Sequence, residues 1–106
     1  MLPGGSYEEV ARWLWNFATS HAKRESPLVE AVLETPEERA GKSYGLRLRL
    51  GDRHFPALHH PPIEFAYSEV AEGKASFAWC EALAKRVRGW ARELLDAGAG
   101  PTTKSA

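Results

Sequence analysis

Residues 44–50, with the sequence YGLRLRL, decide the fold class of this chain. Leucines at the even positions alternate with Arg47 and Arg49, which is the two-residue period of a strand with one buried face. The same period recurs in residues 28–35 and in residues 63–67. We therefore expect three half-buried strands in an antiparallel sheet, with the first two joined as a hairpin.

Helical patterns flank these strands on both sides. Ser6 and Glu9 form a capping box before the first pattern, and Pro27 closes it, because the residue before a proline is pushed out of the α region. The second pattern covers residues 75–96, with Gly98 just past its end. The predicted fold class is α+β, in the order α-β-β-β-α, with a three-stranded antiparallel sheet and two helices packed on one face. The expected apolar sides are Tyr7, Val10, Ala11, Leu14, Phe17, Ala18 and His21 on the first helix, and Trp79, Cys80, Leu83, Val87, Trp90 and Leu94 on the second.

Length and composition describe an ordinary small domain. The chain has 106 residues, so we expect residues 1–97 to form a single compact α+β domain and residues 98–106 a flexible C-terminal tail. Fourteen basic and fourteen acidic residues cancel, so no net field draws the chain to nucleic acid or to anionic membranes. The single cysteine, Cys80, excludes an internal disulfide and fits a reducing compartment. The first residues lack a signal-peptide pattern, and no apolar run is long enough to span a membrane. A cytoplasmic protein without membrane contact is the resulting expectation, and no cofactor is predicted.

The connector between the first two predicted strands contains near-matches to two catalytic loops. Residues 36–43, PEERAGKS, match a phosphate-binding loop except that Pro36 replaces its first glycine. Residues 41–45, GKSYG, match the nucleophile elbow of serine hydrolases. Both loops require a helix to follow them, whereas residues 44–50 predict a strand. We interpret the connector as a hairpin turn and predict no catalytic residue, which favours a non-enzymatic protein.

The histidines define a candidate metal or ligand site. Three of the four lie close together, so His54, His59 and His60, with Glu64, are candidate ligands for zinc, copper or nickel. No zinc-binding spacing accompanies them, and Pro61 is expected to hold His60 in extended backbone, where His59 and His60 would point opposite ways. An irregular connector with polar tips is the alternative interpretation.

The remaining histidine, His21, lies at the centre of the first helix's apolar side. We expect a core or interface histidine that is hydrogen-bonded to a backbone carbonyl.

Basic residues on the predicted sheet suggest a third kind of site. Lys42, Arg47 and Arg49 are candidate nucleic-acid contacts. The element order resembles that of double-stranded-RNA-binding domains, a resemblance that implies clustered lysines at the start of the last helix. Here that region reads KASFAW in residues 74–79. An antiparallel register would also set the glutamates of the first predicted strand opposite these arginines and neutralise the strip. Nucleic-acid binding is therefore the further alternative.

Four tryptophans provide the most informative apolar surface. Trp79 and Trp90 lie on one stripe and are expected to face the core. Trp13 and Trp15 mark the two edges of the first helix's apolar side, so at least one of them must lie at an edge. The second helix, a partner chain or a ligand could close that edge. With Phe17 they form the candidate interface, and the predicted function is a small non-enzymatic interaction domain with a protein partner or a homodimer contact.

Overall fold

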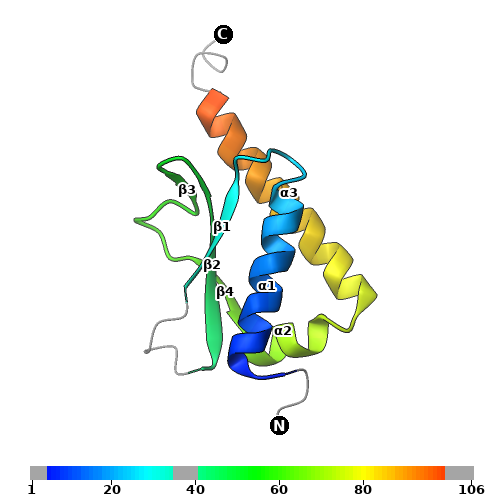
Figure 1. Cartoon of the computed structure of the whole chain (residues 1–106). Helices are drawn as coiled ribbons and strands as arrows, with labels where there is room; N and C mark the ends of the chain where they lie inside the picture. The colour runs from blue at the N-terminus through cyan, green and yellow to red at the C-terminus, as the bar shows by residue number, and fades with distance from the viewer. Residues whose placement is uncertain (1–4, 35–40, 100–106) are drawn as a thin grey trace.

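The computed structural model describes residues 5–34 and 41–99, and these residues form an α+β fold with three helices and a four-stranded antiparallel sheet (Figure 1). The predicted α+β class is confirmed, but the structure adds one strand and one helix to the expected order. The elements are α1 (Tyr7–Ala22), β1 (Glu30–Glu34), β2 (Ser43–Leu50), β3 (Arg53–Phe55), β4 (Ile63–Ala66), α2 (Tyr67–Gly73) and α3 (Phe77–Ala99).

Strand β2 is the centre of the sheet. β1 pairs with one side of it, and β3 and β4 share the other side. The third strand expected from the sequence is therefore present as two pieces, with residues 56–62 looping out between them. The interruption has a local cause, because Pro56, Pro61 and Pro62 lack the backbone N–H that a ladder requires.

Strand β3 was missed although the sequence carries a signal for it. Leu50 pairs with Arg53 across a two-residue connection, Gly51-Asp52, and Gly51 has a φ of 64°. A glycine in the left-handed region is typical of such tight hairpins. The strand itself is only three residues long, which is too short to show an alternating pattern.

The boundaries of α2 and α3 also differ from the prediction. Tyr67 begins α2 instead of ending a strand, and no side chain caps this short helix at Ala66. α3 begins after Ser76, whose hydroxyl accepts a hydrogen bond from the Trp79 N–H at 3.2 Å. It continues through Ala99, so Gly98 lies within the helix and not just past its end. Most of the predicted tail, residues 100–106, lies outside the described residues.

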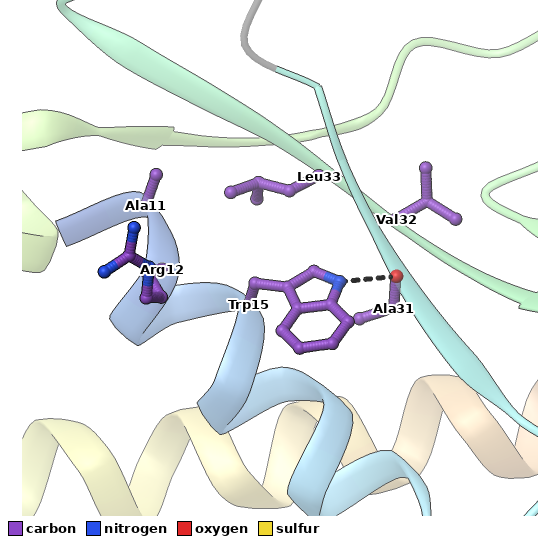
Figure 2. A pocket seen from close by; sticks show the side chains of 6 residues that line it. All are labelled: Ala11, Arg12, Trp15, Ala31, Val32 and Leu33. Carbon is purple, nitrogen blue, oxygen red and sulfur yellow. Dashed lines mark hydrogen bonds between the residues drawn. The ribbon is translucent and has the colours of Figure 1, made fainter. Parts of the chain in front are cut away.

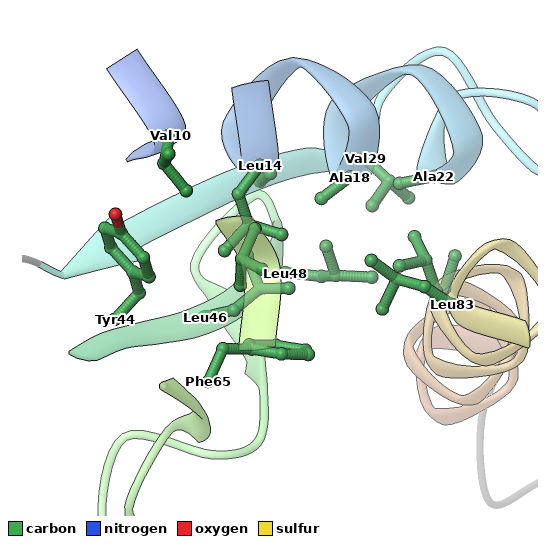
Figure 3. Packing of buried hydrophobic residues seen from close by; sticks show 14 of the residues in the cluster. Val10, Leu14, Ala18, Ala22, Val29, Tyr44, Leu46, Leu48, Phe65 and Leu83 are labelled. Carbon is green, nitrogen blue, oxygen red and sulfur yellow. The ribbon is translucent and has the colours of Figure 1, made fainter. Parts of the chain in front are cut away.

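The hydrophobic core fills the space between the sheet and the helices. Figure 3 shows side chains of α1, the strands and α3 pointing toward one another. Leu14, Leu46, Leu48 and Phe65 are 1% exposed or less, so the even positions of β2 face the helices as the alternation predicted. α1 and α3 lie on the same side of the sheet in Figure 1, which agrees with the predicted layering. Trp79 and Trp90 are half-buried and pack against this core.

The start of α1 is fastened both to itself and to the sheet. The predicted capping box is present, because Ser6 accepts from the Glu9 N–H and Glu9 accepts from the Ser6 N–H. Tyr7 and Tyr44 stack with ring centroids 4.5 Å apart, and the Tyr44 hydroxyl donates to the Tyr7 carbonyl at 2.8 Å. Burial is the main cause that raises the pKa of Tyr44, so this hydroxyl stays protonated. These contacts hold α1 against the sheet and thereby set the groove described next.

Candidate functional site: a groove between helix α1 and the edge of strand β1

Strand β1 pairs only with β2 among the strands that the structure describes, so its other side is an edge of the sheet. The ladder fixes where its backbone groups point. The Lys42 carbonyl accepts from the Tyr67 N–H at 2.8 Å, so even-numbered residues of β2 direct their backbone groups toward β4. Odd-numbered residues of β2 therefore bond to β1, where they lie opposite the even-numbered residues. The backbone groups of Ala31 and Leu33 consequently point outward from the edge.

Trp15 covers part of this edge. Its indole N–H donates to the Ala31 carbonyl oxygen at 2.9 Å, and 42% of the residue remains exposed to solvent. Within residues 5–34 and 41–99, no hydrogen bond is made to the outward Ala31 N–H or to the outward N–H and carbonyl of Leu33. The edge is thus closed at one carbonyl and open at three neighbouring groups.

A groove of about 490 Å³ runs between α1 and this edge (Figure 2). Figure 2 shows the Trp15 ring between the helix and the strand, with Leu33 across from Ala11 and with Val32 on the far side of β1. The floor is apolar, and it lies beside unpaired backbone groups. The lining residues are Ala11, Arg12, Trp15, Ala31, Val32 and Leu33.

Arg12 places a positive charge at one end of the groove. Its side chain is exposed and makes no hydrogen bond or ion pair with any residue in the described parts of the chain. It lies one turn of α1 before Trp15, on the part of the helix that faces Leu33. The groove therefore combines three features, namely an indole surface, a row of unpaired backbone groups and a free guanidinium.

The three residues of the predicted interface do not form one surface. Trp15 lies at the β1 edge, as the expectation that one tryptophan would lie at an edge required. Trp13 stacks on Phe17 with centroids 4.9 Å apart, and its ring centroid lies 6.2 Å from that of Trp79 in α3. Trp13 and Phe17 therefore belong to a second surface, between α1 and α3.

This second surface, which we call the α1–α3 face, contains a hollow of about 260 Å³. Phe77 stands on its rim and is 83% exposed. The lining residues are Phe17, His21, Phe77, Cys80, Glu81 and Ala84.

The ionisable groups of the α1–α3 face are held neutral. Burial, helped by the nearby Arg24 and Arg88 charges, lowers the pKa of His21. Its Nδ1 is buried and has no hydrogen-bond partner among the described residues, contrary to the expected bond to a backbone carbonyl. Burial also raises the pKa of the Cys80 thiol, which is the opposite of what a nucleophilic cysteine requires.

The candidate metal ligands are distributed over several elements. His54 lies in β3 and Glu64 in β4, whereas His59 and His60 lie in the loop between these strands. The two loop rings contact each other with centroids 4.2 Å apart, because the His60 N–H bonds to the Ala57 carbonyl in a turn. They do not point opposite ways as an extended chain would require. No group of three or more His, Cys, Asp or Glu side chains within the described residues is arranged to hold a metal ion.

Two of the three candidate nucleic-acid contacts are engaged inside the protein. Arg49 forms an ion pair with Glu30, directly opposite it on β1. Arg47 is 6% exposed and bonds to Glu34 at 2.9 Å, so the glutamates of β1 neutralise both arginines, as the register predicted. Lys42 is exposed.

The catalytic near-matches also find their structural context. Residues 36–40 of the connector lie outside the described residues. Ser43 is the first residue of β2, so a strand follows the GKSYG segment and the strand-to-helix turn of a nucleophile elbow does not form there. Gly41 has a φ of 71°, which is typical of a turn.

Sequence reasoning missed Arg12 and the outward edge at Leu33. Arg12 was placed among the polar residues of the first helix, and no pattern distinguished it from the others. The edge was in principle accessible, because a strand at the end of a predicted sheet order has one unpaired side. The sheet order itself could not be read from the alternation.

Comparison of this chain with protein-family models, curated proteins and solved structures finds no match. No helix in the described parts of the chain is long and apolar enough to cross a membrane. The argument for function therefore rests on the geometry of the groove.

Proposed function

We propose that this chain is an interaction domain that binds a segment of another polypeptide in the groove between α1 and β1. The observation that carries the proposal is Trp15, a half-exposed tryptophan held by the Ala31 carbonyl beside an open strand edge. Tryptophan is enriched among the residues that contribute most to binding, because it buries a large rigid surface at a small entropic cost.

The neighbouring backbone favours a polypeptide over a small molecule. The outward groups of Ala31 and Leu33 alternate along the strand with the spacing of a peptide backbone. An exposed strand edge is a template for pairing with another chain, and many peptide-binding domains use such an edge. The groove is also bounded by only two elements, whereas small-molecule sites usually enclose most of the ligand.

Selection from a peptide library tests this proposal. Displayed peptides of about ten residues, the length of one strand, are selected on the intact protein and counted again on Trp15→Ala. We expect a set of peptides that bind the wild type and lose at least about tenfold in affinity on Trp15→Ala, which corresponds to roughly 1.4 kcal/mol.

Phe77→Ala is the matched control, because Phe77 is also an exposed aromatic residue but lies on the α1–α3 face. Thermal unfolding of each variant shows that it remains folded. Peptides that bind equally well to Trp15→Ala, or no bound peptides at all, would contradict the proposal.

The α1–α3 face supports a second candidate function, self-association. A two-fold contact requires a patch that is complementary to itself, and this face has a projecting ring, Phe77, beside a hollow lined by apolar side chains. We expect the wild type to form dimers at high concentration and Phe77→Asp to remain monomeric in analytical ultracentrifugation. A wild-type monomer at every concentration would exclude this candidate.

A further inference from the structure

We infer that the bound segment adds to the sheet as a strand antiparallel to β1, with an acidic residue opposite Leu33 and an apolar residue opposite Ala31. The inference rests on the proposed function, because it specifies the ligand of the same groove. It names the class of partner as an extended polypeptide segment with the pattern Asp or Glu, any residue, then an aliphatic or aromatic residue.

The backbone of β1 sets the pairing. Leu33 presents both an N–H and a carbonyl outward, so it can form a doubly hydrogen-bonded pair with one residue of an antiparallel strand. The Ala31 N–H is open as well, and it can donate to the carbonyl two residues further along the added strand. The Ala31 carbonyl is already bonded to Trp15, which limits the pairing at that end.

The side chains of α1 set which residues fit. In an antiparallel pair, residues opposite each other project from the same face of the sheet. Leu33 and Ala31 both face α1, so the two ligand residues opposite them also face the helix. The residue opposite Ala31 meets the exposed indole of Trp15, which favours an apolar side chain.

Arg12 provides the charge selectivity. It faces the Leu33 end of the groove, and its guanidinium has no partner among the residues that the structure describes. A carboxylate opposite Leu33 would pair with this guanidinium, whereas a lysine there would be repelled. Because β1 runs from the Trp15 end to the Arg12 end, an antiparallel segment places its acidic residue before its apolar one.

A second copy of the chain fits the groove less well. The α1-facing positions of β1 itself are Val29, Ala31 and Leu33, which are all apolar, while its glutamates project from the other face. Pairing of two β1 edges would therefore leave Arg12 without a carboxylate. Charge complementarity thus indicates a segment of a different polypeptide.

The experiment begins with the Trp15-dependent peptides of the library selection. Their sequences are expected to be enriched in an acidic residue two positions before an apolar one. For a synthetic peptide of this pattern, Arg12→Glu is expected to weaken binding about fivefold or more, and a peptide with lysine at the acidic position is expected to regain affinity for Arg12→Glu.

The backbone contribution is tested separately. Leu33→Pro removes an N–H that points away from β2, so the ladder with β2 is kept while binding is expected to fall about tenfold. Leu33→Ala is the matched control, since it shortens the side chain and keeps the N–H. A peptide that is N-methylated at the residue opposite Leu33 gives the same test without any change in the protein.

The outcomes separate the binding mode from the proposed function. Trp15-dependent peptides that lack the acidic bias and tolerate both Leu33→Pro and N-methylation would overturn the strand-addition mode and leave the groove as a binding site. Absence of any Trp15-dependent peptide would overturn both. A dimer that Leu33→Pro abolishes would show that a second copy occupies the edge, and it would also overturn the inference.

Discussion

Gly73 ends α2 directly against the ring of Trp79. A Cβ built at this position would lie 2.3 Å from a ring carbon of Trp79, well inside van der Waals contact. We expect Gly73→Ala to lower the free energy of unfolding by about 1–3 kcal/mol, because the half-buried ring would have to move. Urea denaturation measures this change.

Gly89 is the matched control within α3. An added Cβ there meets no atom within 4 Å, so Gly89→Ala is expected to stabilise the protein by about 0.5–1 kcal/mol through its helix propensity. Equal effects of the two substitutions would show that Trp79 does not pack on Gly73 as the structure has it.

His21 makes stability depend on pH. Its pKa in the folded state lies below the ordinary value near 6.5, so the unfolded chain takes up the proton first as the pH falls. The contribution of the neutral ring is therefore complete above that value and is lost below it. We expect the free energy of unfolding to decrease between about pH 7.5 and pH 5.5, and we expect His21→Gln to reduce this slope. An unchanged slope in the variant would contradict the assignment to His21.

Trp15 shows what helical periodicity could and could not predict for a single residue. Its position relative to Trp13 placed it at an edge of the apolar side, and that expectation is confirmed. Its partner, the Ala31 carbonyl, depends on how α1 packs against a strand beyond the turn at Pro27. Such a contact between separate elements leaves no trace in the local pattern.

At the scale of elements, Arg47 replaces the ladder where the sheet is interrupted. It lies on β2 between the residues that pair with Phe55 of β3 and Ile63 of β4. Its guanidinium donates to the carbonyls of Pro56 and Ala57 at 3.0 and 2.8 Å, besides its ion pair with Glu34. One buried side chain thus holds the start of the loop that β3 and β4 leave between them.

Loss of this side chain is expected to be costly. Arg47→Met should lower the free energy of unfolding by about 2–4 kcal/mol, because two carbonyls lose a charged donor and a buried ion pair is broken. Arg49→Met is the matched control on the same strand and face, and it should cost less than about 1 kcal/mol because its ion pair is exposed. Equal costs for the two variants would show that Arg47 does not organise the loop.

The strands illustrate the same division between local and distant information. Alternation identified β1, β2 and β4, since one face of each is buried and the period survives in the sequence. It also placed Arg47 on a solvated face, which was wrong, because the residues that bury Arg47 come from the loop at residues 56–62. The helix α2 was missed because its seven residues follow a strand without a capping side chain.

At the scale of the whole molecule, the layering determines where binding is chemically plausible. Both long helices cover one face of the sheet, and the ion pairs of Arg47 and Arg49 occupy the other. Within the described strands, the open side of β1 is bordered by α1 and not covered by it. The layering followed from the apolar stripes of the sequence, whereas the open edge followed from the strand order.

Amide hydrogen exchange of β1, measured by NMR with and without a Trp15-dependent peptide, tests the central claim most directly. The outward amides of Ala31 and Leu33 should exchange fast in the free protein and become protected on binding. The amide of Val32, which already bonds to β2, should be protected in both states. A bound peptide that leaves Leu33 exchanging as fast as before would show that β1 does not receive a strand.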